Sequence, residues 1–220
     1  FVEFIEGSEI PSILEKHGFD YKLICELDRF SLLENELPNI CADRIDYSLR
    51  EIVDFETPEK FNFILKSLTN HNGTIIFSSL EAAEKFALDF AKCNFEHWAG
   101  NEAKARYHIL SKTLRRALDL NVIKMPDFWK TDYDVIKLLQ DSRDNKILEG
   151  LSMLKNGFRL IPSNKQDSVI LKKKFRHVDP FVSSGGSLIL LSDLSENYKK
   201  SLKSQKEESM KSISIEVIAK

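Results

Sequence analysis

Apolar residues recur at helical spacing along the first two-thirds of the chain. Between Leu80 and Trp98 they form one stripe, made up of Ala83, Phe86, Ala87, Phe90 and Trp98. Between Asn101 and about Ile123 they form a second stripe, made up of Ala103, Tyr107, Leu110, Leu114, Ala117 and Leu118. Both stripes follow the 3.6-residue period of an α-helix. They predict two long helices, each with one face in a core.

Shorter helices are indicated by their end signals. Serine, threonine or aspartate at an N-cap, followed by an early proline, favours a helix start, and Gly or Asn-Gly favours a stop. These signals predict helices over residues 9–17, 20–27, 38–53, 57–72, 131–140 and 145–155. Residues 74–77 form a short run typical of a β-strand.

The pattern changes after residue 157. Strands are expected over residues 158–162, 168–182, 187–191 and 212–219, with a charged helix over 194–210. We therefore predict a mostly α fold with a small C-terminal α+β subdomain. The expected domains are a helical domain at 1–125, a helical extension at 126–157 and the α+β subdomain at 158–220.

Composition narrows the class of protein. The 220 residues are 42% hydrophobic and 30% charged, with a net charge of −2, which argues against a surface that binds nucleic acid everywhere. No apolar run is long enough for a transmembrane helix, so we expect no membrane partner. The cysteines, Cys25, Cys41 and Cys93, form no CxxC pair and predict thiols of a reducing, cytoplasmic location. Because Phe1 opens the chain within an apolar pattern, we expect further sequence upstream.

The stretch Ala42–Glu51, ADRIDYSLRE, carries the most chemistry. On a helix, Asp43, Tyr47 and Glu51 fall at i, i+4 and i+8 and share one face. The opposite face is apolar and consists of Ile45, Leu49, Ile52 and Val53. The alternative is a solvated face on which Asp46 and Arg50 form an i, i+4 ion pair worth a few tenths of a kcal/mol.

This stretch resembles the last signature motif of HD-superfamily metal-dependent phosphohydrolases, in the branch with deoxynucleotide triphosphohydrolases. The motif, roughly (V/A)DR-x-DY-x-x-RD, is matched at Asp43, Arg44, Asp46, Tyr47 and Arg50, whereas Glu51 replaces the final Asp. A second stretch, KKFRHVDPFV at Lys173–Val182, is similar to a C-terminal segment of the same branch. The resemblance implies that residues 1–125 are the C-terminal part of an HD-type helical domain.

The resemblance also implies an enzyme that hydrolyses a phosphate ester or anhydride. Asp43 matches a catalytic metal ligand, Arg44 a phosphate contact, Tyr47 a residue packed on the sugar and Glu51 an acceptor for a sugar hydroxyl. The implied cofactor is a divalent metal (Mn, Mg, Fe, Ni or Zn), since such a metal activates water for attack on phosphorus. A nucleotide, with a deoxynucleoside triphosphate as first choice, is the expected substrate.

The chain departs from the family in its histidines. It has no His-Asp dipeptide and no HxxxH or HxxH pair, and one carboxylate does not make a metal site. The family's His and His-Asp motifs lie upstream of its Asp motif, so we expect the other ligands there. The alternative is a degenerate HD fold that binds a nucleotide or a protein without turnover.

Two further candidates stand apart from this motif. By resemblance, Tyr107 matches a residue that completes the nucleotide pocket, although its place in the apolar stripe favours a core tyrosine. Residues 172–177, KKKFRH, alternate basic and aromatic side chains and fit either an RNA-binding strand or a lysine-protected edge strand. We favour the edge strand and do not expect nucleic acid as a partner. The long helices are compatible with a homo-oligomer.

Overall fold

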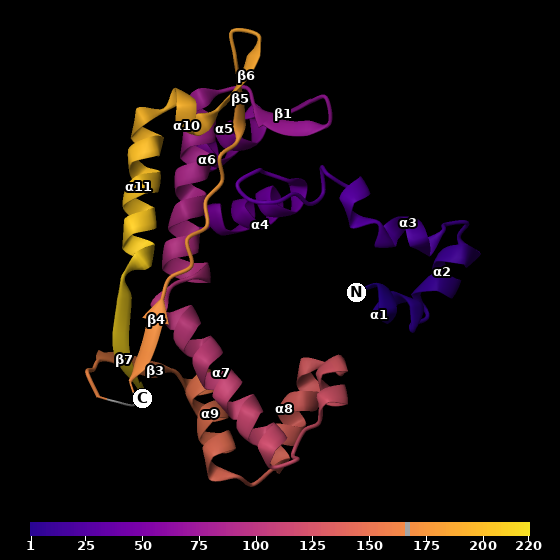
Figure 1. Cartoon of the computed structure of the whole chain (residues 1–220), viewed down its shortest axis with the longest axis vertical. Coiled ribbons are helices and arrows are strands. Elements are labelled where there is room, and N and C mark those ends of the chain that lie inside the picture. Colours follow the sequence, from indigo (N-terminus) through magenta and orange to yellow (C-terminus); the bar gives the residue numbers. More distant parts are fainter. Residues whose placement is uncertain (166–167) are drawn as a thin grey trace. The chain divides into compact units, whose positions relative to one another are not determined.

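The structure is a computed structural model of the whole chain and describes residues 1–165 and 168–220 (Figure 1). It divides into two compact units, each made of two segments of the chain. The first unit comprises Phe1–Cys93 and Arg176–Leu202, and the second comprises Asn94–Phe175 and Lys203–Lys220. The domain boundaries expected at residues 125 and 157 stay a prediction.

The first unit contains most of the short helices. They are α1 (Val2–Glu6), α2 (Ile10–Lys16), α3 (Tyr21–Cys25), η1 (Leu27–Arg29), α4 (Ala42–Ile52), α5 (Pro58–Ser67), α6 (Leu80–Cys93) and α10 (Leu191–Leu194). Two predicted caps are confirmed: the Asp20 carboxylate accepts from the Lys22 N–H at 2.9 Å and the Thr57 hydroxyl from the Lys60 N–H at 3.4 Å. The cap predicted at Ser8 is wrong, because the N-cap of α2 is Glu9 and it makes no side-chain cap hydrogen bond. Helix α11 (Glu196–Met210) runs from the first unit into the second.

A four-stranded sheet completes the first unit. Its strands, in the order β1-β2-β5-β6, are β1 (Leu68–His71), β2 (Thr74–Phe77), β5 (Phe181–Ser184) and β6 (Ser187–Leu190). Strands β1 and β2 form a hairpin whose two turn residues, Asn72 and Gly73, have φ values of 50° and 81°. Strand β2 pairs in parallel with β5 through Phe77 and Val182, which joins two distant parts of the chain.

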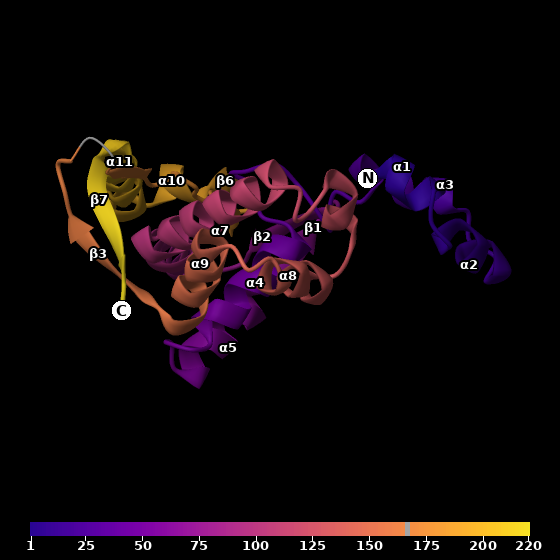
Figure 2. The same cartoon turned by 90° about the horizontal axis from the view of Figure 1, so that it is seen from below.

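The second unit combines helices with a three-stranded antiparallel sheet. Its helices are the π-helical turn η2 (Asn94–Trp98), α7 (Asn101–Asp119), η3 (Met125–Trp129), α8 (Asp132–Asp141) and α9 (Asn145–Asn156). The sheet has the order β3-β7-β4, with β3 (Phe158–Pro162), β7 (Ser212–Ala219) and β4 (Val169–Lys172). Helices α7 and α9 lie side by side in both views (Figure 2).

The prediction of a mostly α, or all-α, protein is wrong. The described residues hold seven strands in two sheets, one in each unit, so the fold is an α+β mixture. The strands expected to form one small C-terminal subdomain are divided between the two sheets. Strands β5 and β6 extend the β1-β2 hairpin, whereas β3, β4 and β7 pair with one another. Sequence order does not reveal this, because a strand pairs with any edge that tertiary packing offers it.

Several boundaries also differ from the predictions. The helix expected from Pro38 begins at Ala42, and the helix expected to reach residue 72 ends at Ser67, where β1 begins. By contrast, helices α8 and α9 and strands β3, β6 and β7 are confirmed to within one or two residues. No helix in the described ranges is long and apolar enough to cross a membrane.

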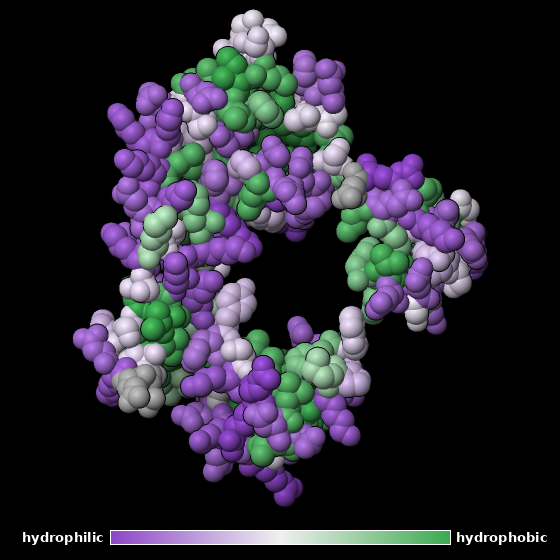
Figure 3. Space-filling view, viewed as in Figure 1, coloured by the Kyte–Doolittle hydropathy of each residue, from purple (hydrophilic) through white to green (hydrophobic). Residues whose placement is uncertain are grey.

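The N-terminal segment of the first unit leaves much apolar surface uncovered. Helices α1–α3 pack mainly on one another. Hydrophobic surface is visible over this segment (green in Figure 3). Large apolar side chains that stay exposed there include Phe1, Phe4, Ile13, Phe19, Leu23 and Leu33.

Of the predicted thiols, Cys41 and Cys93 are buried and Cys25 is half-buried, and all are free.

Candidate functional site

Helix α4 carries the ADRIDYSLRE motif, and its start is set by the preceding loop. The first backbone N–H groups of a helix have no partner within it. In α4, the Ala42 N–H donates to the Leu32 carbonyl at 2.7 Å and the Asp43 N–H to the Leu33 carbonyl at 3.1 Å. Further along, the Ser48 hydroxyl donates to the Arg44 carbonyl at 2.6 Å. The loop therefore holds the first turn of α4, and Asp43 with it.

The predicted apolar face of α4 is largely confirmed. Ile45, Leu49 and Ile52 are buried, with Ile52 at 0% exposure, whereas Val53 is 51% exposed and lies outside the core. Val53 is the C-cap of α4 and keeps a helical backbone conformation, so its exposure marks the end of the covered part of this face. The remaining face of the helix is left for polar side chains.

The face of α4 that carries Asp43, Tyr47 and Glu51 becomes less exposed along the helix. Asp43 is exposed at the first turn, and Tyr47 and Glu51 are half-buried. Burial raises the pKa of the Tyr47 phenol, and the Arg44 and Arg176 cations oppose that rise. Burial, followed by the negative charges of Glu51 and Asp89, raises the pKa of the Cys93 thiol to about 12. Glu51 therefore lies near the end of α6, whereas Asp43 faces solvent.

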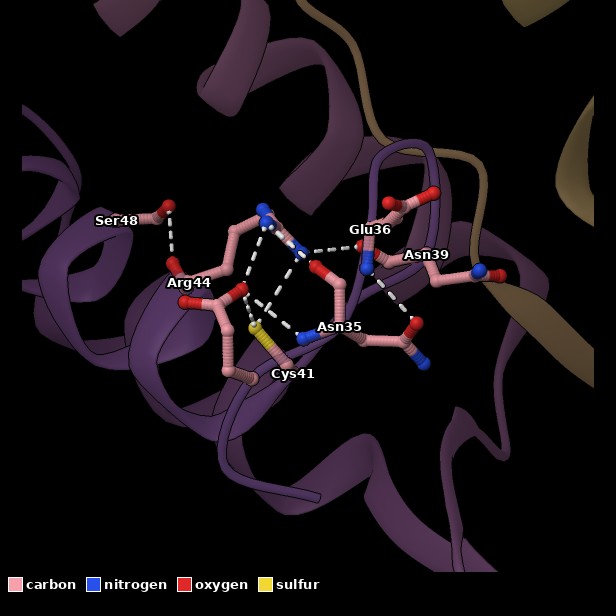
Figure 4. Close-up of polar contacts among 7 residues, drawn as sticks. Asn35, Glu36, Asn39, Cys41, Arg44 and Ser48 are labelled. Carbon is pink, nitrogen blue, oxygen red and sulfur yellow. Dashed lines mark hydrogen bonds and ion pairs between the residues drawn. The ribbon is translucent and has the colours of Figure 1, made fainter. Parts of the chain in front are cut away.

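Arg44 is used to fasten the loop of residues 34–41 (Figure 4). Its Nη1 donates to the Asn39 carbonyl at 2.6 Å and approaches the Cys41 sulfur at 3.3 Å. Its Nη2 donates to the Asn35 carbonyl at 2.9 Å and pairs with Glu34 Oε1 at 3.2 Å. The side chain is only 10% exposed. The predicted phosphate contact of Arg44 stays a prediction, and these partners already engage both terminal nitrogens.

Asp46 and Arg50 form the expected surface pair. Arg50 Nη2 lies 2.9 Å from Asp46 Oδ2, and both side chains are well exposed, at 77% for Arg50 and 62% for Asp46. An exposed pair of this kind contributes at most a few tenths of a kcal/mol. This part of the motif therefore belongs to the solvated side of α4.

The second motif stretch also contacts this region, through its Asp179. Val178, Asp179 and Pro180 are buried, whereas Arg176 is exposed. The Asp179 N–H donates to the Pro38 carbonyl at 2.8 Å. The Asp179 carboxylate accepts from the Ser192 N–H at 2.9 Å and from its hydroxyl at 2.6 Å. Thus the segment that leads into β5 is attached to the loop that Arg44 fastens.

A buried phenol supports the same segment and was missed by sequence analysis. Tyr198, in α11, is 0% exposed, and its hydroxyl donates to the Val178 carbonyl. Burial, with a contribution from the Asp179 charge, strongly raises the pKa of Tyr198. The charged pattern of residues 194–210 predicts a solvated helix, so composition alone hides this one inward tyrosine.

A second group missed by sequence analysis is a charge cluster on α6. Lys85 Nζ lies 2.7 Å from Asp89 Oδ1 and also pairs with Glu56, and Glu56 lies 3.3 Å from Lys60 Nζ. Asp89 is 5% exposed, and burial raises the pKa of its carboxyl. The spacing of Lys85 and Asp89 is the i, i+4 signal that a sequence reader could have used. Each charge has an ionic partner within the described residues, although Asp89 Oδ2 is buried without a hydrogen bond. The cluster joins α6 to the residues after α4.

Tyr107 and the first four residues of the basic stretch, Lys172–Phe175, belong to the second unit. Tyr107 lies on α7 in the second unit and is 66% exposed, so its interpretation as a core tyrosine is wrong. Strand β4 ends at Lys172, yet exposure still alternates beyond it: Lys172, Lys174 and Arg176 are exposed, and the residues between them are half-buried. Lys173 Nζ lies 5.0 Å from the centre of the Phe95 ring, a cation–π contact.

The side chains of the described residues do not make up the implied metal site. Among residues 1–165 and 168–220, no group of three or more His, Cys, Asp and Glu side chains could hold a metal ion. Structural and catalytic sites need about three protein ligands. The described residues therefore do not fit a complete metal site by themselves, and Asp43 is at most one ligand of such a site.

Comparison with known proteins places this geometry in context. The chain is 31% identical over 224 residues to the uncharacterized protein YdhJ of Bacillus subtilis (strain 168), a match that covers 99% of the chain and 68% of YdhJ. Over 52 residues it is 40% identical to the metal-dependent phosphohydrolase cns2 of Cordyceps militaris, which covers 24% of the chain and 15% of cns2. No family model matches. The shorter match indicates a relationship to metal-dependent phosphohydrolases.

Proposed function

The chain belongs to the same family as YdhJ of Bacillus subtilis, and we propose that it forms one wall of a divalent-metal-dependent phosphohydrolase that acts on a nucleotide. The observation that carries this proposal is the exposed carboxylate of Asp43 on a helix face that continues through Tyr47 and Glu51. The local 40% identity to a protein named as a metal-dependent phosphohydrolase supports the reaction class. A deoxynucleoside triphosphate is the first substrate to test.

Each side chain of the face has a distinct task in this proposal. Asp43 contributes one metal ligand, and a bound divalent metal would supply an activated water and neutralise phosphoryl oxygens. Tyr47 and Glu51 lie about 6 and 12 Å further along the helix axis, at 1.5 Å per residue. That distance suits a sugar that extends away from a bound phosphate. The half-buried Tyr47 ring would pack on the sugar, and Glu51 would accept a hydrogen bond from its hydroxyl.

The other metal ligands must come from residues outside this set. YdhJ extends beyond the part that the chain matches, since the match covers 68% of its length. We place the remaining ligands in family sequence that these 220 residues do not include. On this proposal, the 220-residue chain with manganese releases no phosphate from nucleotides. Robust turnover by the chain alone, abolished by a chelator, would contradict this placement.

A second candidate function is nucleotide or protein binding without turnover. The absence of a metal-holding group within the described residues favours it. The two candidates differ in one measurable property: only the enzyme releases phosphate or pyrophosphate from a nucleotide. The protein expressed from its complete coding sequence separates them.

The test compares two aspartates of the same helix. In the protein expressed from its complete coding sequence, Asp43→Ala should abolish both metal binding and nucleotide hydrolysis. Asp46→Ala breaks only the exposed pair with Arg50 and should keep both properties. Metal is measured by plasma mass spectrometry and phosphate release by a colorimetric assay. If Asp43→Ala keeps stoichiometric metal and a normal rate, the proposal loses its basis. Nucleotide binding without phosphate release by the unaltered protein would favour the second candidate.

A further inference from the structure

The two units carry opposite net charges. The second unit contains 20 Lys and Arg against 13 Asp and Glu, a net charge of +7, whereas the first contains 12 against 21, a net charge of −9. The value of −2 for the whole chain averages the two, and it is this average that argues against a nucleic-acid partner. An excess of positive charge on one unit instead favours an anionic partner for that unit.

Helix α7 carries part of this positive charge on the face that turns away from its buried residues. Between Glu102 and Asp119 the helix contains no acidic residue. Positions three and four apart are neighbours on a helix, so two adjacent rows of side chains run along this face. The rows consist of Lys104, His108 and Lys112, and of Tyr107, Ser111 and Arg115. We call these six residues the α7 face.

The cations of the α7 face have no acid to pair with. The other two arginines of the helix do: Arg106 pairs with Glu102 at 2.7 Å, and Arg116 with Asp144 at 2.7 Å. The cations of the face form no ion pair within residues 1–165 and 168–220; they are Lys104, Lys112 and Arg115. Lys112 and Arg115 are exposed and Lys104 is half-buried. Their charges are therefore available to an anion.

The start of the basic stretch adds two more cations near the beginning of this helix. Strand β4 lies beside the first turns of α7 (Figure 1). The Asn94 amide, which is 1% exposed, donates to the Lys174 carbonyl at 3.1 Å, and Lys173 lies over the Phe95 ring. These contacts hold the stretch against η2, the turn that leads into α7. Lys172 and Lys174 are exposed and form no ion pair in the described part of the chain.

Tyr107 distinguishes among the anions that this surface could bind. Its side chain is 66% exposed, although it lies in the middle of the rows of polar residues. A nucleic-acid base stacks on such a ring while neighbouring cations neutralise the phosphates, and single strands leave their bases free to do so. A lipid surface would favour several large apolar side chains along the face. The α7 face has only this one.

We propose that the α7 face binds single-stranded nucleic acid, with Lys104, Lys112 and Arg115 at backbone phosphates and Tyr107 stacked on a base. Lys172 and Lys174 extend the positive surface beyond the start of the helix. This inference does not depend on the proposed function, because it uses no residue of α4. The ligand class is a single strand of RNA or DNA, whose phosphates and bases supply the same two contacts.

The experiment measures binding of labelled oligouridylate and oligodeoxyuridylate, each of about 12 nucleotides, by fluorescence anisotropy. The protein is expressed from its complete coding sequence, and EDTA removes divalent metal so that no hydrolysis interferes. The variants are the pair Lys112→Gln with Arg115→Gln, the single change Tyr107→Leu, and a control pair, Lys16→Gln with Lys22→Gln. The control removes the same charge from exposed positions of the first unit.

The α7 pair should weaken binding by roughly tenfold or more at about 0.1 M salt. It should also reduce the slope of log affinity against log salt by about 1.4, since each phosphate contact contributes about 0.7. Tyr107→Leu should weaken oligonucleotide binding by roughly tenfold. It should leave the affinity for inorganic polyphosphate, measured by competition, unchanged. The control pair should match the unaltered protein.

Three results would overturn the inference. An equal loss in the control pair would mean that binding follows overall charge and not the α7 face. If Tyr107→Leu binds as the unaltered protein does, and polyphosphate competes as well as the oligonucleotide, the face binds anions in general and not nucleic acid. Absence of binding of either oligonucleotide to the unaltered protein at about 0.05 M salt would remove the basis of the inference. If one oligonucleotide binds more tightly, that preference identifies RNA or DNA as the partner. Circular dichroism confirms that each variant is folded.

Discussion

Helices α4 and α7 both present a clear apolar period, and the predicted core face is confirmed along α4 but only in the second half of α7. In α4 the buried apolar positions are the large aliphatic residues Ile45, Leu49 and Ile52. In α7 the buried positions are Ala105, Ile109, Thr113 and Ala117, whereas the larger Tyr107 and Leu110 are exposed. An apolar stripe drawn through the larger side chains therefore identifies the apolar core face of α4 but misidentifies that of α7 in its first half. In its second half Ala117 is buried, and Leu114 and Leu118 pack against the same core cluster.

The difference follows from what each helix packs against. Helix α7 lies beside α9, and Gly150 of α9 faces Thr113 so closely that a Cβ added at Gly150 would lie 2.1 Å from the Thr113 hydroxyl oxygen. Small side chains permit this approach and large ones would prevent it. The Thr113 hydroxyl donates to the Ile109 carbonyl at 2.9 Å, so its burial leaves no polar group without a partner. A close helix pair selects small residues, and hydropathy alone does not report that selection.

Two adjacent residues of α7 provide the strongest test of this comparison. Ile109 is 6% exposed and Leu110 is 38% exposed. Ile109→Ala should lower the free energy of unfolding by about 2–4 kcal/mol through lost burial and a cavity. Leu110→Ala should lower it by less than about 1 kcal/mol, as surface substitutions do. Urea denaturation measures both. Equal losses of stability in the two variants would mean that Leu110, a member of the predicted apolar stripe, is as much a core residue as Ile109.

Two arginines of α4 test the other helix. Arg44→Met should lower the free energy of unfolding by about 2–3 kcal/mol, because it removes charged hydrogen bonds to the loop of residues 34–41. Arg50→Met, which removes an exposed ion pair, should cost less than about 1 kcal/mol. Chemical denaturation of the two variants side by side gives the difference. If Arg44→Met were as stable as Arg50→Met, Arg44 would be free for another role, including the phosphate contact.

The close approach of α7 and α9 can be tested at Gly150. Gly150→Ala should destabilise the chain by about 1–3 kcal/mol through overpacking, despite the better helix propensity of alanine. The double variant Gly150→Ala with Thr113→Ala should recover most of that loss, because it removes the oxygen that the new methyl group meets. Thermal melts of the single and double variants provide the measurement. A stabilised single variant would show that the helices lie further apart.

Local signals predict much of this fold, and long-range contacts account for the errors. The caps at Asp20 and Thr57 depend on neighbouring residues only, and both are confirmed. The start of α4 depends on the carbonyls of Leu32 and Leu33, which no local rule includes. The helix stop predicted at Asn72-Gly73 is wrong, because the same pair is the usual turn of a two-residue hairpin. The largely exposed strand before it has no alternating pattern that would reveal it.

For the candidate site, too, local periodicity predicts one part and long-range contacts decide the rest. Periodicity places Asp43, Tyr47 and Glu51 on one face of a helix, and the structure keeps them on α4 with exposure that falls from the first to the later residues. Periodicity does not reveal that Arg44 is occupied by its own loop, since that depends on carbonyls five to nine residues upstream. Nor does it reveal that Asp179 is attached to the loop that Arg44 fastens, because this attachment depends on the hydrogen bond from the Asp179 N–H to the Pro38 carbonyl.

The smallest expected effect concerns pH and the contact between α7 and α9. Arg116 of α7 donates two hydrogen bonds of 2.7 Å to Asp144, the N-cap of α9. This bonding, aided by backbone N–H groups of α9, lowers the pKa of Asp144 from 3.8 to about 2. Because the folded pKa is the lower one, the stabilisation is complete above about pH 3.8 and is lost as the pH falls through about 2.

Asp144→Asn keeps the shape and the capping ability of the side chain but removes its charge. Its melting temperature should lie below that of the wild type at about pH 7, and the gap should narrow as the pH falls from about 4 toward about 2. Asp141→Asn, at an exposed position of the preceding helix, should show no such narrowing. Melting curves recorded from neutral pH downward measure the gap. A gap that stays constant with pH would mean that the charge of Asp144 does not join the two helices, and that the small-residue contact at Gly150 joins them without its help.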